Sequence, residues 1–245
     1  MPSSGIFFLP SSAIVTPESK IVDSLLIHFT KRFSCVSLPK WNLQHKLFRE
    51  VPLPNTPQNE TNSKNQETRY LQVLSLPYQS ENTHVAITAT TQSSSQPQEI
   101  TPNSSSESAG AGNVEPATVV AVPKASTDGF VQLLHARFGP LWTPRQTTIV
   151  ADGHTLEIGS FRIRLGELRQ AQPQAQVVSK GVVVEIEYNG KEQEEDDDWG
   201  IAEGLIRAFW SDLGIKGARE YFRTAGEEDG FGNVRQWCEV LRLLR

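Results

Sequence analysis

The chain has 245 residues, of which 38% are apolar and 21% are charged, and its formal net charge is −5. This acidic balance argues against a domain that binds nucleic acid mainly through a basic surface. No apolar run reaches the roughly 18 residues that a membrane-spanning helix needs. The two cysteines are too few for a disulfide scaffold, so a reducing compartment is expected.

The distribution of aromatic residues predicts the organisation of the chain. None lies between Tyr78 and Phe130, and this interval contains runs of Ser, Gln and Pro. Such a stretch buries too little apolar surface to offset the entropy of ordering it. We therefore predict a disordered Ser/Pro-rich insert at residues 91–116. It separates a first α+β half at 1–90 from a second at 117–245, which ends in C-terminal helices, and the two halves are expected to form one domain.

The first half opens with an apolar strand at residues 6–9. Thr16 and Pro17 are typical of a helix start, because the hydroxyl can cap the helix and proline suits its first position. Pro39 is expected to end the helical region, and a strand follows at residues 42–48. The apolar face of this helix has helical spacing and consists of Ile21, Val22, Leu25, Phe29 and Phe33.

The second half repeats this order. An apolar strand at residues 118–122 precedes a helix that Ser126 or Thr127 can cap, and a further strand is expected at 145–151. Strand, helix, proline, tryptophan and strand thus occur twice, with Trp41 and Trp142 in matching places. This order favours an internal pseudo-repeat, although any α+β chain can contain such runs. The apolar face of the second helix comprises Phe130, Val131, Leu134 and Phe138.

Antiparallel pairing is indicated after each helix. The runs at residues 70–76 and 84–90 flank a polar turn and predict a hairpin. In the second half, Asp152-Gly153 is a tight-turn dipeptide between two β-type runs, and Gly159-Ser160 marks another turn.

Two later strands alternate apolar with charged residues, in the ranges 161–165 and 182–188. Alternation implies one buried and one solvated face. If these strands pair, Arg162 and Arg164 face Glu185 and Glu187, and each such exposed pair contributes about 0.2–1 kcal/mol. The main effect of these charges is on register, because a slip of one residue would bury them.

Two amphipathic helices close the chain. The first carries Gly200, Gly204 and Ala208 four residues apart, a face that can approach another element closely. The apolar stripe of the first helix is Ala202, Leu205, Ile206, Phe209 and Leu213, and that of the second is Val234, Trp237, Cys238, Leu241 and Leu244.

The acidic run that precedes Trp199 is the most polar feature of the chain. It could form a cation site, but it lacks the alternating ligand spacing and turn glycine of a calcium loop. A solvated loop leading into a helix N-terminus is the simpler interpretation. The five histidines and two cysteines have no zinc-ligand spacing, and no nucleophile or phosphate-loop motif is present. The sequence therefore predicts no catalytic, cofactor-binding or metal residues. The run consists of Glu192, Glu194, Glu195, Asp196, Asp197 and Asp198.

Three stretches of the second half carry a resemblance to a known family, and the first half fits more loosely. The chain resembles subunit 20 of the Mediator complex, the subunit related to the TATA-binding protein. Its polar inserts depart from the compact family pattern and look like lineage-specific loops, as in a fungal member. The matching stretches are residues 141–146, 156–166 and 180–188, followed by Asp197-Asp198-Trp199 at the opening of a helix.

The resemblance implies an α+β fold in which a curved antiparallel sheet or barrel is packed by helices in a pseudo-twofold arrangement. It also implies a non-catalytic subunit of the Mediator head module in the nucleus. Such a subunit would pair with Mediator subunit 18 and contact other head-module subunits, coupling regulators to RNA polymerase II. No cofactor is expected, the acidic charge predicts no direct contact with DNA, and the lack of a long apolar run predicts no contact with membrane. Trp41, Trp142 and Trp210 are the interface candidates to examine, although core packing is the simpler role for each. The alternatives are a metal-dependent enzyme that uses the acidic run, and a DNA-binding saddle.

Overall fold

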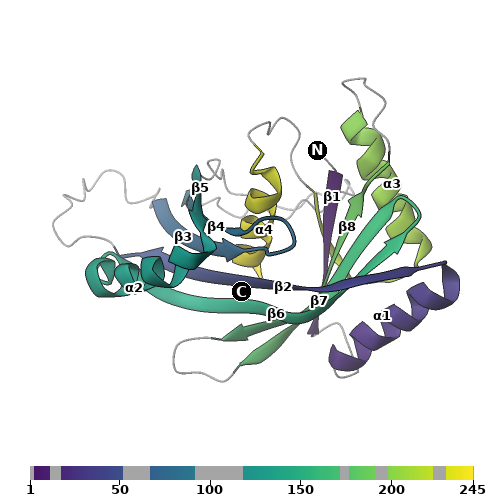
Figure 1. The fold of residues 1–245 in the computed structure, drawn as a ribbon, viewed down its shortest axis with the longest axis horizontal. Helices are drawn as coiled ribbons and strands as arrows, with labels where there is room; N and C mark the ends of the chain where they lie inside the picture. The colour runs from purple at the N-terminus through teal and green to yellow at the C-terminus, as the bar shows by residue number, and fades with distance from the viewer. Residues whose placement is uncertain are drawn as a thin grey trace, which may run out of the picture.

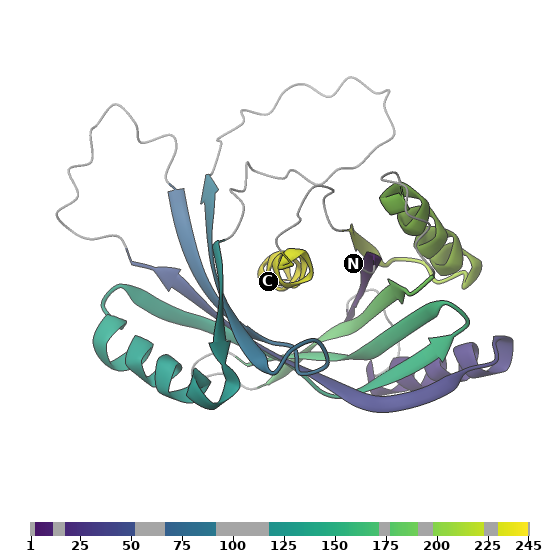
Figure 2. The same ribbon diagram turned by 45° about the horizontal axis from the view of Figure 1, so that its top comes forward.

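The protein is described by a computed structural model that covers residues 3–11, 18–51, 67–91, 118–171, 177–190, 198–222 and 230–244. Nine strands form one sheet in the order β5-β4-β3-β2-β6-β7-β8-β1-β9, and every neighbouring pair is antiparallel (Figure 1). The sheet is open and strongly curved (Figure 2). The predicted α+β fold with a curved antiparallel sheet is confirmed, in its open form and not as a closed barrel.

The elements have the following bounds. The strands are β1 (Ser3–Pro10), β2 (Val36–Glu50), β3 (Glu67–Ser75), β4 (Asn82–Thr91), β5 (Thr118–Pro123), β6 (Trp142–Ile158), β7 (Phe161–Ala171), β8 (Val178–Tyr188) and β9 (Arg219–Phe222). The helices are α1 (Glu18–Arg32), α2 (Thr127–Phe138), α3 (Asp198–Asp212) and α4 (Gly232–Leu243), and a short 3-10 turn, η2 (Lys124–Ser126), precedes α2.

The strand order has an approximate twofold symmetry about the central pair, β2 and β6. On one side of that pair lie β3, β4 and then β5, and on the other lie β7, β8 and then β1. The first strand of each half therefore joins the sheet formed by the other half. This arrangement agrees with the repeat that the sequence suggested, and it makes the two halves share one continuous sheet.

The helices cover both faces of the sheet. α1 and α3 pack on the outer, convex face of β1, β6, β7 and β8, and α2 packs on the same face of β2, β3 and β4. α4 lies alone among the described helices on the inner, concave face, where it occupies the hollow of the curved sheet (Figure 2). None of the described helices is long and apolar enough to cross a membrane.

The outer face buries much of the predicted apolar stripes of the first three helices. Val22, Leu25 and Phe29 of α1 are buried, and Trp210 of α3 stacks on Phe7 with ring centroids 4.2 Å apart. Removing such side chains from water stabilises the fold by about 1.5–3 kcal/mol each.

Two exposed stripe residues correct the predicted helix faces. Leu205 of α3 and Phe138 of α2 are 40% and 42% exposed. A Cβ added at Gly200 or Gly204 would meet no atom within 4 Å, so the small-residue face of α3 has no neighbour among the described residues.

Two breaks expected from the sequence are irregularities inside long strands. Pro39 lies within β2, because α1 already ends at Arg32, and the β2–β6 register shifts between Leu38 and Trp41. Proline is tolerated at such a position because the ladder is interrupted there. Asp152-Gly153 makes no turn either, since β6 runs through it without a break and its register with β7 shifts between Ile149 and His154.

Other expectations are confirmed, and some fall on segments that are not described. The hairpin of β3 and β4 and the turn at Gly159-Ser160 are present, and Gly159 has a φ of 56°. The short strand β9 was not predicted. Thr16, Pro17, the insert at residues 91–116 (except Thr91, the last residue of β4) and the acidic run up to Asp197 lie outside the described residues.

Candidate interaction site on the inner face of the sheet

α4 covers the centre of the inner face. Its sequence places large apolar side chains at helical spacing, and every member of the predicted stripe is buried, with Trp237 and Cys238 at 0% exposure. The helix therefore buries its apolar side on the sheet. It shares there one core with buried, inward-facing residues of seven strands, which include Ile6, Phe8, Leu43, Leu74, Val150 and Val183.

Trp41 of β2 forms the floor of the inner face beside α4. Its indole Nε1 donates a hydrogen bond to the backbone oxygen of Leu165 at 3.1 Å, and its ring lies 6.1 Å from the ring of Trp237. Gly153 and Gly166 lie beneath the indole, and a Cβ at Gly153 would overlap the Trp41 nitrogen. Gly153 is thus needed for space and not for a turn.

A buried cluster of charges lies next to Trp41. Arg164 of β7 binds Glu185 through Nη1 and Glu187 through Nη2, each at 2.8 Å. The arginines of β7 thus face the glutamates of β8 as the alternating strands predicted, with Arg164 directly opposite Glu185. Arg162 approaches Glu187 at 3.9 Å, so two cations face two carboxylates. Contrary to the expectation of an exposed pair, the side chain of Glu185 is 0% exposed and that of Arg164 is 7% exposed, because α4 and the β3–β4 turn cover this face.

Neutral donors complete the coordination of Glu185. Its Oε1 accepts hydrogen bonds from Nε1 of Trp237 and from Nδ2 of Asn233, both at 3.2 Å. Both donors belong to α4. The carboxylate therefore links the helix to the sheet, and Arg164 supplies the charge that permits its burial.

Tyr78 closes the cluster from the β3–β4 turn. Its hydroxyl accepts a hydrogen bond from Nε1 of Trp237 at 3.1 Å and is hydrogen-bonded to Glu185. Burial of the hydroxyl and the nearby Glu185 charge raise the pKa of Tyr78 well above its usual 10, although Arg164 acts in the opposite direction. The side chain is therefore a neutral phenol at physiological pH.

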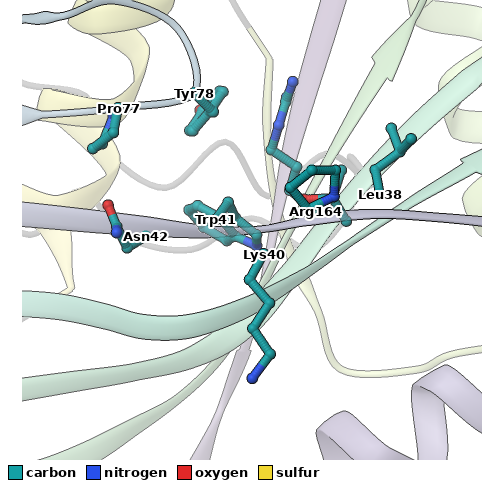
Figure 3. Close-up of a pocket in the computed structure, with 9 residues that line it drawn as sticks. Leu38, Lys40, Trp41, Asn42, Pro77, Tyr78 and Arg164 are labelled. Carbon is teal, nitrogen blue, oxygen red and sulfur yellow. The ribbon is translucent and has the colours of Figure 1, made fainter.

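A cavity of about 290 Å³ opens beside these residues. Its lining comes from β2, the β3–β4 turn, β6 and β7 and includes Pro39, Trp41, Tyr78 and Arg164. Figure 3 shows the Lys40 side chain directed away from Tyr78. Arg164 is held by Glu185 and Glu187, so the cavity contains aromatic and apolar surface and a neutralised cation.

A second polar network lies on the same inner face, in the half of the sheet formed by β2, β3 and β4. His45 Nε2 is 2.9 Å from Oε1 of Gln72, whose Nε2 donates to Oγ1 of Thr88 at 3.2 Å. All three side chains are buried. Burial lowers the pKa of His45 to about 4, with the Gln72 hydrogen bond acting in the opposite direction, so the imidazole is neutral.

The three tryptophans named from the sequence lie in different places. Trp41 is 3% exposed on the inner face and Trp210 is 4% exposed on the outer face, so core packing describes both. Trp142 is partly buried against the α2 core. The sequence reasoning missed Tyr78 and the role of Glu185, because no local pattern shows that the β3–β4 turn and α4 converge on β8.

Residues with catalytic or metal-binding chemistry do not gather in this site. No group of three or more His, Cys, Asp or Glu residues that could hold a metal occurs within the described segments. Cys238 is buried, which raises the pKa of its thiol to about 12. His28 and His135 are exposed on the surfaces of their helices. The acidic run that precedes Trp199 lies outside the described residues up to Asp197.

The fold and this inner face define a TATA-binding-protein-like class in which the hollow of the saddle is filled by the protein's own helix. A family model described as the TATA-binding related factor (TRF) of subunit 20 of the Mediator complex matches residues 1–242. The chain therefore belongs to this family of Mediator subunits, which act in transcription regulation as part of a nuclear coactivator complex for RNA polymerase II. No curated individual protein gave a match.

Proposed function

We propose that this chain is a non-catalytic scaffold of the Mediator head module. It pairs with Mediator subunit 18, contacts other head-module subunits and couples regulators to RNA polymerase II. The observation that carries the proposal is the position of α4. Because this helix occupies the inner face of the sheet and α1, α2 and α3 cover the outer face, the surfaces left for function are the exposed sides of the helices and the sheet edges, which are suited to protein contacts.

The inner face gives no support to a DNA-binding saddle. A minor-groove saddle needs an exposed, positively charged concave surface with apolar side chains free to enter between base pairs. Here Trp41 and Trp237 are buried against each other, and Arg164 is neutralised by Glu185 and Glu187. The net charge of −5 opposes DNA binding further.

The polar groups of the inner face also suit a structural role. A catalytic acid or base needs a pKa near the working pH. The pKa of Tyr78 is raised well above 10, that of Cys238 is raised to about 12, and that of His45 is lowered to about 4. Each of these groups is therefore held in its neutral form near pH 7. Such neutral, hydrogen-bonded groups fit the support of a rigid scaffold.

The proposal is tested by purifying the tagged full-length chain from nuclei and identifying the proteins that remain bound. We expect Mediator head subunits in near-equal amounts, with subunit 18 retained in the highest salt. In parallel, fluorescence anisotropy with an AT-rich duplex should show no salt-dependent binding. Recovery of the chain without any Mediator subunit, or tight binding to the duplex, would refute the proposal.

A further inference from the structure

The edge strand β5 differs from the edge strand at the opposite end of the sheet. β5 is made of Thr, Val, Ala and Pro without a charged residue, and among the described strands it pairs only with β4. Val120, at its centre, is 57% exposed. Natural sheet edges are normally protected by charges, prolines or covering elements. Within the described part of the chain, the central four apolar residues of β5 have no such protection, although Pro123 ends the strand.

The pseudo-twofold symmetry of the sheet allows the edge of β5 to be compared with the equivalent edge of β1. β1 is the counterpart of β5, and both strands end in a proline, Pro10 and Pro123. Aligning these prolines makes Phe7 of β1 the equivalent of Val120 of β5. Phe7 and Val120 both point to the outer face, as their register partners Val184 and Val85 do.

Phe7 and Val120 differ in what covers them. β9 pairs antiparallel with β1 from Gly5 to Phe8, and its Phe222 makes an edge-on contact with Phe7 at 5.8 Å. Phe222 of β9 and Trp210 of α3, whose ring stacks on Phe7 at 4.2 Å, together leave Phe7 0% exposed, whereas Val120 has 57% of its surface exposed. The strand position beside β1 is filled by β9, and the equivalent position beside β5 is empty within the described part of the chain.

The undescribed segments of this chain are chemically poor candidates for that position. A strand there requires alternating apolar side chains, as β9 supplies with Tyr221 on the inner face and Phe222 on the outer face. The segment that follows β4, residues 92–117, contains only two large aliphatic residues, Ile100 and Val114, and no aromatic residue. Residues 52–66 contain three prolines and nine Asn, Gln, Ser or Thr residues. The gap at residues 12–17 includes Ile14 and Val15, but it joins β1 to α1 at the other end of the strand order from β5, and the remaining internal gaps are polar or acidic.

We infer that the free edge of β5 binds an extended segment of the partner subunit, which adds as a tenth, antiparallel strand beside Thr118–Ala121. This inference rests on the proposed function, because it takes the partner to be subunit 18 of the Mediator complex. The recognised segment is uncharged and β-forming, and it places an apolar side chain over Val120 as Phe222 lies over Phe7. Main-chain hydrogen bonds supply most of the affinity in this mode of binding.

Hydrogen exchange of the full-length chain, alone and in complex with subunit 18, tests the inference. In an edge strand, alternate amides point away from the sheet, so addition of a strand protects amides that otherwise exchange rapidly. We expect exchange in the peptide that contains Thr118–Pro123 to slow by about tenfold or more in the complex. The peptide that contains β9 serves as an internal reference.

Three variants separate an edge contact from a contact with the sheet surface. Val120→Lys introduces an edge charge and should weaken the complex by about tenfold or more. Val120→Thr keeps a β-branched side chain and should weaken it by less than about threefold. Ile87→Lys is the matched control, because Ile87 lies on the same face of the neighbouring strand β4 and is 42% exposed. It should also have an effect below about threefold, because β5 separates it from the added strand.

Each outcome has a distinct meaning. A stable complex with unchanged exchange in β5, or equal effects of Val120→Lys and Ile87→Lys, would overturn the inference and leave the proposed function intact. Slow exchange of the outward β5 amides in the chain alone would show that a segment of this chain or a second copy fills the edge. Light scattering distinguishes these two cases, and either one overturns the inference. Failure of subunit 18 to bind at all would contradict the proposed function and remove the partner that this inference requires.

Discussion

The guanidinium carbon of Arg164 lies 4.0 Å from the centre of the Tyr78 ring. The same side chain binds Glu185 and Glu187 with its two terminal nitrogens. One arginine thus joins the β3–β4 turn, the middle of the sheet and, through Glu185, the helix α4. The contacts are buried, so they fix the position of α4 on the inner face more firmly than surface ion pairs could.

Removal of the Arg164 charge should destabilise the protein strongly. Arg164→Met leaves the buried Glu185 carboxylate without its cation, and we expect a loss of about 3–5 kcal/mol in the free energy of unfolding. Urea denaturation followed by circular dichroism measures the loss. Arg162→Met is the matched control, because Arg162 is 34% exposed and its carboxylate contacts are 3.6 and 3.9 Å long. It should cost at most about 1 kcal/mol, and equal losses for the two variants would contradict this account of the cluster.

The Tyr78 hydroxyl predicts a dependence of stability on alkaline pH. The pKa of Tyr78 is raised above 10 in the folded protein, so its contribution is complete below pH 10 and is lost as the pH rises further, when the unfolded chain ionises first. We expect Tyr78→Phe to cost about 1–2 kcal/mol at pH 8, because Trp237 and Glu185 lose a hydrogen-bond partner. The variant should then lose less stability than the wild type between pH 9 and 11, measured as the shift in urea midpoint. An equal loss of stability in both proteins between pH 9 and 11 would show that folding does not raise the pKa of Tyr78.

The buried His45 predicts the opposite dependence, in acid. Its pKa is lowered to about 4 from an ordinary value of 6.5, so its contribution to stability is present above pH 6.5. As the pH falls toward 4 the unfolded chain takes up the proton first, and up to about 3 kcal/mol is lost.

The test compares His45→Gln, which can still hydrogen-bond Gln72, with the wild type at pH 7.5 and pH 4.5. The difference in unfolding free energy between these two pH values should be smaller in the variant. His28→Gln, which changes an exposed histidine, is the matched control for removing an imidazole. If His45→Gln lost as much unfolding free energy between pH 7.5 and pH 4.5 as the wild type, the account of His45 as a buried, neutral imidazole would be contradicted.

The lack of room for a side chain at Gly153, beneath the Trp41 indole, can be tested by adding a single methyl group. Gly153→Ala places a Cβ against the indole nitrogen, and we expect a cost of about 1–3 kcal/mol from overpacking. Trp41→Phe in the same chain should recover part of this loss, because the smaller ring vacates the position of the indole nitrogen. Gly204→Ala in helix α3 is the control, because a Cβ at Gly204 would meet no atom within 4 Å. This variant should stabilise the protein by about 0.5–1 kcal/mol, since alanine favours a helix more than glycine does. Thermal unfolding of the wild type, the two single variants and the double variant measures these effects. A melting temperature of Gly153→Ala equal to that of the wild type would contradict the explanation.

The acidic run that precedes Trp199 predicts a negative result with metals. A solvated acidic loop binds divalent cations weakly, so 1 mM Ca²⁺, Mg²⁺ or Mn²⁺ should change the melting temperature by less than about 1 °C. A metal at 100 times its dissociation constant would stabilise the fold by about 2.7 kcal/mol, which is easily detected. A clear increase that EDTA reverses would favour the metal-dependent alternative.

Local sequence patterns predicted those features that depend on periodicity. Alternation of charged and apolar residues placed Arg162 and Arg164 on the same face as Glu185 and Glu187, because a period of two fixes the face of every residue, and the structure pairs Arg162 with Glu187 and Arg164 with Glu185. The buried stripe of α4 was also correctly predicted from its helical spacing.

Features that depend on tertiary packing were not predictable in this way. The alternating strands suggested a solvated face for Arg164, and only the position of α4 explains its burial. Asp152-Gly153 has turn chemistry, but the bulk of Trp41 on the neighbouring strand provides the reason for the glycine. The exchange of β1 and β5 between the halves follows from the sheet order, which no local segment encodes.

The central claim, that this protein acts by assembly as a Mediator subunit, is tested most directly by co-expression of the full-length chain with Mediator subunit 18. Size-exclusion chromatography with light scattering then gives the mass of the purified species. We predict co-elution as a one-to-one complex that persists in salt strong enough to screen surface charges. A soluble, monomeric chain that elutes apart from subunit 18 would contradict the claim.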